Sequence, residues 1–352
     1  MNQIKKIGIV GLGMIANGRH IPELLNVENC IITAICDIDE NKLKSVGDSL
    51  NIPNQFRFTN YNDLISCDEV DAIEICTPNH LHIPIAVTAI KVGKPINIEK
   101  PISIDLPSCK PLLRAVKEKN IPNMMCFTYR FMPAIRYAKW IIDNGLIGDI
   151  LNVDVEYFKD SGFITGRRLE WRFQKEKAGT GVLGDLGVHL IDMAELLAGK
   201  ITSVCGFTDI IVKERQKLDS DEWARVETDD YCSFICNIEN GIRGNFVISR
   251  CAMGKPNSVK FDVYGSKGTI CFIMNNPDVL DVYSKLNDDW NKKLITVDVP
   301  QNFHTTQEAE FIKMLCGEPC DLLPTIEDGI RSQKILDAIL KSSKNNSWVK
   351  IK

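Results

Sequence analysis

Short apolar runs alternate with amphipathic stretches over residues 1–125 of the chain. The apolar runs occupy residues 6–10, 31–36, 72–76, 95–98 and 123–126, and the amphipathic stretches lie around 15–26, 39–50, 81–92 and 106–119. Runs that are apolar at nearly every position predict strands buried on both faces, and their alternation with helices predicts a parallel sheet. The pattern therefore indicates a doubly wound α/β domain over residues 1–125.

The pattern changes in the second part of the chain, where the predicted strands are longer and alternate between polar and apolar residues. These strands cover residues 151–158, 203–211, 231–239, 241–250, 259–265 and 268–274. The Asn240-Gly241 pair predicts a hairpin turn, and a second glycine-bounded turn lies within 264–270. We expect an α+β domain over residues 126–352, with a large open and mostly antiparallel sheet. Closing helices near 305–316 and 324–341 could pack back on the first domain.

Composition narrows the class of protein. Of 352 residues, 44% are hydrophobic and 25% are charged, with a net charge of −4, which is typical of a globular protein without an electrostatic footprint for nucleic acid. No apolar run approaches the ~20 residues that span a bilayer, and the start shows no signal-peptide pattern, so we expect a cytoplasmic protein. The thirteen cysteines contain no C-x-x-C pair, which argues against a disulfide framework and fits a reducing compartment.

A glycine-rich motif follows the first predicted strand directly and opens a helix. It reads Gly11-x-Gly13-x-x-Ala16, where the glycines allow a tight turn and close approach of a pyrophosphate, and Ala16 allows close packing of helix on strand. We expect residues 11 and 13–16 to bind a dinucleotide: Gly11, Gly13, Met14, Ile15 and Ala16. Asp37 ends the second strand, where a carboxylate accepts from ribose hydroxyls and repels a 2′-phosphate, so NAD is favoured over NADP.

Two further strand ends are predicted to reach the same sheet edge, because ligands of open α/β sheets bind at the carboxyl ends of strands. They carry the sequences CTPNHLH (76–82) and NIEKPIS (97–103). Their candidate cofactor-binding residues are Thr77, Pro78, Asn79, His82, Glu99 and Lys100. The His80-x-His82 pair lacks a nearby acidic or cysteine partner, so we expect no metal site there.

Asp185 and His189 raise a separate question, because they lie four residues apart in the helical stretch GTGVLGDLGVHLID (179–192). On a helix this spacing places both side chains on one face. The apolar positions of the same stretch form their own stripe, so the helix has a packing face besides this pair. By spacing alone, a solvated structural pair and part of a site both remain open.

At this point five co-linear stretches resemble one known family, the glucose-fructose oxidoreductase, inositol dehydrogenase and MocA-like (Gfo/Idh/MocA) oxidoreductases. They are GIVGLGMIA (8–16), CTPNHLH (76–82), EKPIS (99–103), YRFMPA (129–134) and WRFQKEKAGTGVLGDLGVHLID (171–192). The resemblance implies an N-terminal Rossmann domain and a C-terminal α/β domain whose open sheet is commonly used for dimer or tetramer contacts. Thr180 departs from the usual Gly-Gly-Gly entrance but leaves the Asp-x-x-x-His spacing intact.

The resemblance also implies an active site. Lys100, Asp185 and His189 match the family's catalytic lysine, aspartate and histidine. Candidate substrate-binding residues are Tyr129, Arg130, Tyr157, Arg172, Asp185 and His189. With these positions in family register, we interpret the Asp185 and His189 pair as part of an active site, in which His189 is the favoured general base. Residues 159–178 form a long polar segment that we expect to act as a specificity loop.

The sequence thus predicts an NAD-dependent oxidoreductase that oxidises a secondary ring hydroxyl of a sugar, cyclitol or glycoside, C3 of a glycoside being one candidate. Its partners would be a small carbohydrate or glycoside substrate and further copies of the chain, with neither nucleic acid nor membrane. Two alternatives remain open: NAD-dependent cleavage of a glycoside through transient oxidation at C3, and a non-catalytic NAD-binding regulator. Lys100 and His189 could exchange the roles of base and electrophile.

Overall fold

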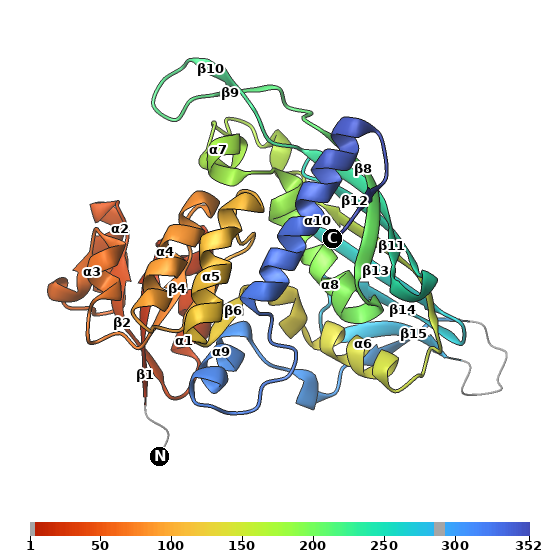
Figure 1. Cartoon of the computed structure of the whole chain (residues 1–352), viewed down its shortest axis with the longest axis horizontal. Helices are drawn as coiled ribbons and strands as arrows, with labels where there is room; N and C mark the ends of the chain where they lie inside the picture. The colour runs from red at the N-terminus through yellow and green to blue at the C-terminus, as the bar shows by residue number, and fades with distance from the viewer. Residues whose placement is uncertain (1–3, 285–292) are drawn as a thin grey trace. The chain divides into compact units, whose positions relative to one another are not determined.

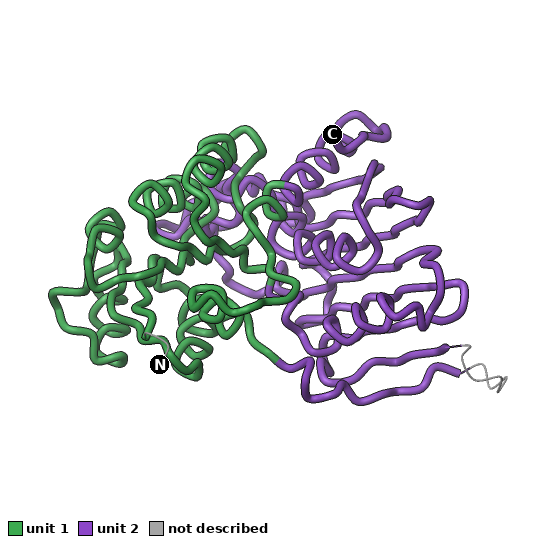
Figure 2. Tube along the Cα trace, turned by 60° about the horizontal axis from the view of Figure 1, so that its bottom comes forward, with its two compact units in different colours: residues 1–127, 305–330 green, residues 128–304, 331–352 purple. Residues whose placement is uncertain are grey.

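The computed structural model describes residues 4–284 and 293–352, and the chain divides into two compact units. Unit 1 comprises Met1–Phe127 and Thr305–Ile330, and unit 2 comprises Thr128–His304 and Arg331–Lys352 (Figure 2). The chain therefore returns to unit 1 after completing most of unit 2. That residues 1–125 and 126–352 fold as separate domains stays a prediction.

Unit 1 is built on a six-stranded parallel sheet with the order β3-β2-β1-β4-β5-β6. The strands are β1 (Lys5–Val10), β2 (Cys30–Cys36), β3 (Arg57–Phe58), β4 (Ala72–Ile75), β5 (Ile96–Ile98) and β6 (Asn123–Met125). Every residue of β4 and β5 is buried, as expected for central strands that are covered on both faces. The predicted doubly wound sheet is confirmed. Its short strand β3 was missed because two residues carry no alternation.

Helices follow the strands of unit 1 in turn (Figure 1). They are η1 (Ala16–His20), α1 (Ile21–Leu25), α2 (Glu40–Ser49), α3 (Tyr61–Ile65), α4 (Asn79–Lys91), α5 (Lys110–Lys119) and, from the returning segment, α9 (Gln307–Leu315). The predicted helix after the glycine motif begins as a π-helical turn, η1, which buries His20 completely. The sequence analysis missed α3, because a helix of 5 residues is too short to show a helical period.

Unit 2 is built on a nine-stranded sheet with the order β16-β15-β14-β13-β7-β12-β11-β8-β17. Its strands are β7 (Ile150–Phe158), β8 (Ile201–Asp209), β11 (Tyr231–Ile238), β12 (Arg243–Ser249), β13 (Ser258–Gly265), β14 (Gly268–Ile273), β15 (Val279–Ser284), β16 (Ile295–Asp298) and β17 (Val349–Lys350). Among the described residues of this sheet, only the β7 and β12 pair is parallel, so the predicted mostly antiparallel sheet is confirmed. A separate hairpin joins β9 (Glu214–Gln216) to β10 (Trp223–Arg225).

The turn between β11 and β12 has the geometry that its residues favour. Asn240 has φ 57° and Gly241 has φ 82°, and both residue types tolerate this left-handed region. The predicted hairpin is confirmed by the antiparallel pairing of β11 with β12, and the predicted second turn by the pairing of β13 with β14.

One face of the nine-stranded sheet carries the core of unit 2. On that face the rings of Phe234 and Phe246 stack with centroids 4.3 Å apart. The longer helices of the unit are α6 (Pro133–Asp143), α8 (Val188–Ala198) and the part of α10 (Ile326–Asn345) that follows Ile330. Positions of the alternate register, including Phe207 and Ile235, are 53% and 47% exposed. Helix α6 was missed, although Ala134, Ala138 and Ile141 follow a helical spacing that could have revealed it.

Candidate active site

The glycine loop of unit 1 is shaped by close backbone approach. Gly11 has φ 94°, and a Cβ atom there would lie 2.7 Å from the carbonyl oxygen of Cys76, at the end of β4. Only glycine fits such a position. At Gly13 the described residues leave the Cβ direction open for 4 Å, as a loop that approaches a pyrophosphate requires. Asn17, which sequence reasoning missed, supports the loop by donating its side-chain amide to the carbonyls of Leu12 and Gly13.

Asp37 lies half-buried behind this loop, at the end of β2. One of its carboxylate oxygens accepts from the backbone N–H of Leu12 at 2.8 Å, and the other accepts from the N–H of Asp39 at 2.9 Å. The carboxylate is therefore held at the place where the sequence analysis expects ribose hydroxyls, and each of its oxygens retains a further lone pair for a ligand.

The rest of this sheet edge fits a dinucleotide as well. Thr77 Oγ1 and His80 Nδ1 are buried and have no hydrogen-bond partner among the described residues, so a ligand with polar groups would satisfy them. Met14 is 77% exposed beside Gly13, and Ala16 is completely buried where the helix packs on the strand. The donor and acceptor set, together with the two glycines, fits NAD.

Lys100 follows β5 in a segment that is fixed on both sides. The preceding residue, Glu99, accepts from the backbone N–H of Lys100 at 3.0 Å, and the carbonyl of Pro101 lies 2.8 Å from Nδ1 of His82. The other ring nitrogen of His82 faces the carbonyl of Thr77 at 2.9 Å. Burial lowers the pKa of His82, so the ring is neutral and donates to one of the two carbonyls. His82 thus links the two predicted cofactor segments, 76–82 and 97–103.

In unit 2, Asp185 and His189 lie on one helical segment that begins with a π-helical turn and continues as an α-helix. Asp185 belongs to a π-helical turn, η7 (Leu183–Gly187), whereas His189 lies in α8. The sequence analysis expects a helix here, and the structure adds that its first part is a π-helical turn. Turns of the π type are rare and occur frequently at functional sites, because they redirect side chains relative to regular α geometry.

Asp229 fixes the entrance of this helix, and sequence reasoning missed it. Its buried carboxylate accepts from the backbone N–H groups of Gly181 and Leu183 at 2.6 and 2.8 Å. A Cβ atom at Gly181 would lie 1.8 Å from the Asp229 carbonyl, so this glycine is required, whereas Thr180 is accommodated in a buried position. Forty-eight residues separate Gly181 from Asp229, so no local signal could reveal the contact.

Four predicted residues converge in unit 2. The ring of His189 stacks on Tyr129 with centroids 4.5 Å apart and planes 20° apart, and Tyr129 donates its hydroxyl proton to the Tyr157 hydroxyl at 2.9 Å. Tyr157 in turn donates to the side-chain oxygen of Asn257. Burial, then Tyr129, then Asp185 raise the pKa of Tyr157, which stays a neutral donor and lies close enough to Asp185 to sense its charge. His189 itself is buried.

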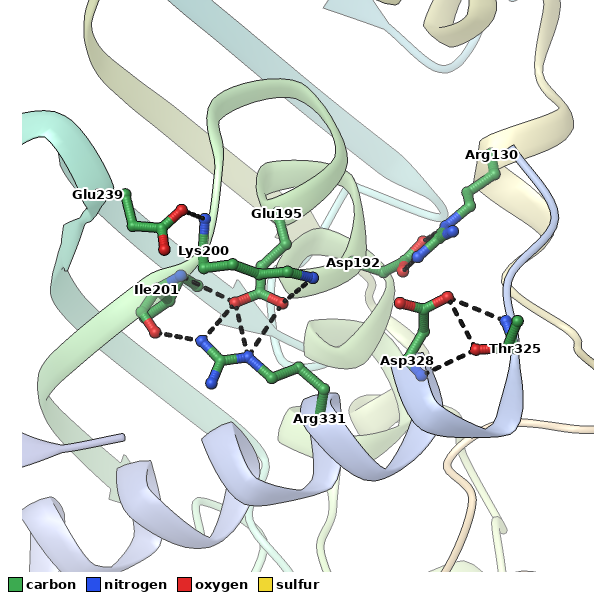
Figure 3. Close-up of polar contacts among 9 residues, drawn as sticks. All are labelled: Arg130, Asp192, Glu195, Lys200, Ile201, Glu239, Thr325, Asp328 and Arg331. Atoms are coloured by element: carbon green, nitrogen blue, oxygen red, sulfur yellow. Dashed lines mark hydrogen bonds and ion pairs between the residues drawn. The ribbon is translucent and has the colours of Figure 1, made fainter. Parts of the chain in front are cut away.

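The other two substrate candidates are engaged differently. Arg130 donates from Nε and Nη2 to the Asp192 carboxylate at 2.5 to 3.0 Å, and both side chains are buried (Figure 3). This fork of hydrogen bonds commits Arg130 to a structural partner. The guanidinium carbon of Arg172 lies 4.4 Å from the centre of the Trp171 ring, and its Nη1 lies 3.9 Å from Glu170.

Part of the predicted specificity loop, residues 159–178, has a core of its own. Leu169 and Phe173 pack with Val226, next to the β9 and β10 hairpin. The guanidinium groups of Arg167, Arg215 and Arg250 surround the Phe173 ring at 4.8, 4.3 and 5.4 Å. This half of the segment is therefore anchored, and its role in specificity stays a prediction.

A Rossmann sheet whose edge fits a dinucleotide is typical of NAD-dependent oxidoreductases. Family models agree: residues 5–127 match the oxidoreductase family, NAD-binding Rossmann fold, and residues 135–271 match the GFO/IDH/MocA C-terminal domain. The chain belongs to the Gfo/Idh/MocA family of oxidoreductases, and it is an NAD-dependent dehydrogenase acting on CH–OH groups.

Individual relatives support this membership. The chain is 31% identical to levoglucosan dehydrogenase of Pseudarthrobacter phenanthrenivorans over 83% of both chains. It is 27% identical to glucose-6-phosphate 3-dehydrogenase of Bacillus subtilis over 97% of both. Among solved structures, levoglucosan dehydrogenase in complex with NADH and levoglucosan superposes with a TM-score of 0.90 at 27% identity, covering 99% of both chains. No described helix has the length and apolarity needed to cross a membrane.

Proposed function

We propose that the protein oxidises a secondary ring hydroxyl of a sugar, cyclitol or glycoside, C3 of a glycoside being one candidate, with NAD as acceptor. The observation that carries the proposal is the stack of His189 on Tyr129, whose hydroxyl is tied to Tyr157. This contact fixes the plane of a potential base beside phenol and carboxylate groups, which suit a substrate with several hydroxyls. Relatives named for levoglucosan and glucose 6-phosphate add support.

Each residue of the proposed site has a role that its chemistry allows. Bound NAD supplies the hydride acceptor. His189 takes the hydroxyl proton, since an unperturbed imidazole pKa of about 6.5 lies close to working pH. Lys100 donates a hydrogen bond to the reacting oxygen and stabilises the developing alkoxide charge. Asp185 accepts from a neighbouring substrate hydroxyl and thereby orients the ring.

A coupled assay tests the reaction. Purified protein is incubated with NAD and a panel of inositols, free monosaccharides, levoglucosan and aryl glycosides, while NADH and free aglycone are followed together. NADH that accumulates with an intact glycosidic bond supports the proposal. Aglycone release without net NADH would indicate glycoside cleavage through transient oxidation, and binding of NAD without turnover of any compound would indicate a regulator.

Substitutions test the assigned residues. We expect Lys100→Ala and His189→Ala each to lower kcat by about 10²-fold or more, the usual contribution of a positioned acid or base. Lys91→Ala and His304→Ala are matched controls, because both residues are solvent-accessible and lie outside the proposed site. Near-normal turnover in either of the first two variants would show that the site is assigned wrongly.

Asp37 is proposed to set the coenzyme preference. Removing its carboxylate in Asp37→Ala removes both the acceptor for ribose hydroxyls and the charge that opposes a 2′-phosphate. The ratio of kcat/KM for NAD to that for NADP should fall by about tenfold or more, equivalent to ~1.4 kcal/mol. An exposed carboxylate on the same unit, Glu69, provides the control variant Glu69→Ala. An unchanged ratio in Asp37→Ala would refute this role.

We also propose that copies of the chain associate through the open face of the nine-stranded sheet. Phe207 and Ile235 lie on this face, and Phe207 contacts Tyr231 with ring centroids 6.4 Å apart. Exposed apolar side chains on one sheet face favour association. Sedimentation of the wild type and of Phe207→Ser/Ile235→Ser tests it: a smaller species in the variant supports the proposal, and an unchanged species contradicts it. A cytoplasmic location stays a prediction.

A further inference from the structure

A buried histidine in unit 1 is surrounded by carboxylates that the proposed reaction does not use. His20 lies on η1 and is fully buried. Its Nδ1 lies 2.7 Å from Glu308 on α9 and 2.9 Å from Glu74 on β4, and its Nε2 lies 3.0 Å from Glu99. Four segments that are far apart in the sequence therefore meet at one imidazole ring.

The ring carries a proton on each nitrogen, because both nitrogens face carboxylate oxygens, which only accept. Burial lowers the pKa of His20, but the neighbouring negative groups outweigh it and hold the pKa well above its ordinary value. The thiol of Cys76 adds no charge at neutral pH, because burial raises its pKa to about 12. The carboxylates of Glu308, which faces Nδ1, and of Glu99, which faces Nε2, are therefore the groups that keep His20 charged.

One imidazolium does not neutralise three buried carboxylates, so a further proton is required at neutral pH. Burial, followed by the charge of Glu308, raises the pKa of Glu74 to about 8. Glu74 and Glu308 both approach the same nitrogen, so a negative charge on Glu308 disfavours a second one on Glu74, and Glu74 holds the proton. Asn97 donates to Glu74 at 2.7 Å, Gln307 donates to Glu308, and the buried Cys126 thiol donates to Asn97.

Glu99 connects this cluster to Lys100. One of its oxygens faces Nε2 of His20, and the other accepts from the backbone N–H of Lys100, both at 3.0 Å. A single carboxylate thus bridges the buried imidazolium and the backbone of the residue that follows it. Because the ring is charged, the bridge is a charge-assisted hydrogen bond, which is stronger and more directional than a neutral one.

We propose that His20, acting through Glu99, is a positioning residue that fixes the backbone of Lys100 and thereby places its ammonium group at the sheet edge. The inference rests on the proposed function, in which Lys100 contacts the reacting oxygen. His82 holds the other side of the same segment through the Pro101 carbonyl. Two buried histidines therefore clamp the segment around Lys100.

The same cluster has the donor types of a metal site, since ligand atoms of His20, Glu74 and Cys76 lie within 4.8 Å of one another. The separations favour protons. Zinc bonds of about 2.0–2.1 Å place tetrahedral nitrogen and oxygen ligands roughly 3.3–3.4 Å apart. The His20 nitrogens lie 2.7–3.0 Å from their carboxylates, which is the range of charge-assisted hydrogen bonds.

Two substitutions of His20 separate positioning from simple packing. In His20→Gln the amide nitrogen corresponds to Nε2 and keeps the hydrogen bond to Glu99, whereas in His20→Asn it corresponds to Nδ1 and keeps the side of Glu74 and Glu308. We expect kcat to fall by about tenfold to 10²-fold in His20→Asn, since displacement of about 1 Å has effects of this size. His20→Gln should stay within about threefold of wild type, and KM for NAD should change little in both.

The outcomes are distinct from those that test the proposed function. Wild-type kcat in Lys100→Ala would overturn the proposed function. If Lys100→Ala is impaired but the two His20 variants have equal kcat at similar thermal midpoints, the positioning proposal is wrong. Adding His20→Asn to Lys100→Ala should lower the residual rate by less than about threefold, because residues that act as one unit are non-additive. Full additivity would contradict it.

Two further measurements keep the proposal testable if a His20 variant does not fold. Glu99→Gln retains the shape of the side chain but turns an amide N–H toward a donor, so one arm of the bridge is lost and kcat should fall. Wild-type kcat in Glu99→Gln would refute the bridge. Elemental analysis of the purified wild-type protein should find no stoichiometric transition metal, and a bound metal would overturn the protonated cluster.

Discussion

Each unit buries an ionic group beside a residue of the proposed site, but the two groups are built differently. Unit 1 sets one imidazolium against three carboxyl groups around His20, of which Glu74 holds a proton at neutral pH. Unit 2 sets one guanidinium against one carboxylate in the Arg130 and Asp192 pair, next to Tyr129. The first group holds excess negative charge and a titratable cation, and the second is balanced and its cation does not titrate. The His20 cluster should therefore depend on pH, whereas the Arg130 and Asp192 pair should not.

The two groups differ because the two cations need different numbers of carboxylates to stay charged. A guanidinium stays charged at any physiological pH and fits a carboxylate as a fork, so one partner suffices. An imidazolium loses its proton near neutrality unless negative groups surround it. Several carboxylates around His20 therefore keep the ring charged, and they create the requirement for an additional proton on Glu74.

Breaking the balanced pair should have the largest effect on stability. Arg130→Ala leaves the buried Asp192 carboxylate without its guanidinium, and breaking a buried ion pair typically costs about 3–5 kcal/mol. We expect a correspondingly lower free energy of unfolding in denaturant titrations. The double variant Arg130→Met/Asp192→Leu, which removes both charges, should recover much of the loss. If the double variant were as unstable as Arg130→Ala, the cost would lie in packing rather than in the unpaired charge.

The unbalanced cluster should make the stability of unit 1 depend on pH. The folded-state pKa of Glu74, about 8, lies above its ordinary value of 4.5, and the pKa of His20 is also raised above its ordinary 6.5. The folded state therefore binds more protons than the unfolded state between pH 4.5 and 8. The contribution of this cluster to the free energy of unfolding is fully present at the acidic end of this window. It falls as pH rises, by up to ~1.4 kcal/mol per pH unit for each proton.

Glu74→Gln tests this dependence, because an amide keeps the shape of the protonated acid and does not titrate. We expect the thermal midpoint of the variant to fall less steeply between pH 6 and about 8 than that of the wild type. Glu69→Gln is the matched control, since Glu69 is half exposed and pairs with Lys6 on the same unit. Identical slopes in the wild type and Glu74→Gln would show that Glu74 does not hold the proton.

The smallest effect on stability is expected for a substitution that changes neither the His20 cluster nor the Arg130 and Asp192 pair. Tyr129→Phe removes one neutral hydrogen bond to Tyr157, while the ring remains stacked on His189. A net loss of about 0.5–1.5 kcal/mol in the free energy of unfolding is expected, without a change in its pH dependence. A loss as large as that of Arg130→Ala would mean that the tyrosine pair, rather than the ion pair, anchors this part of unit 2.

The sequence predicted those features that depend on local periodicity and on spacing along the chain. Apolar runs gave the parallel sheet, alternation and the Asn240-Gly241 pair gave the antiparallel sheet, and the glycine motif gave the loop on β1. Tyr129 and His189 lie in stretches that match the family, whereas Tyr157 was a candidate from its place on the first strand of the second domain, and no local pattern showed that the three converge. Their roles in the reaction stay predictions.

Features that depend on distant contacts could not be predicted. Asp229, which lies between β10 and β11, accepts hydrogen bonds from the residues that lead into η7. Glu308 contacts His20, which lies 288 positions earlier in the sequence. A buried ion partner leaves no periodic signal, because an isolated glutamate in an amphipathic helix resembles a surface residue. The π-helical turns η1 and η7 were not predicted either, because hydrophobic periodicity cannot distinguish one π-helical turn from an α-helical turn.

The cysteines of the two cores have a practical consequence. Burial raises the pKa of Cys36 in unit 1 and of Cys236 in unit 2 to about 12, and the Cys232 thiol is raised well above its ordinary value. A protonated thiol inside a core is inert toward alkylating reagents, so each of these groups reacts only when its surroundings open. The alkylation rates of these cysteines, measured peptide by peptide, therefore report how often the core of each unit opens to solvent, without any engineered label.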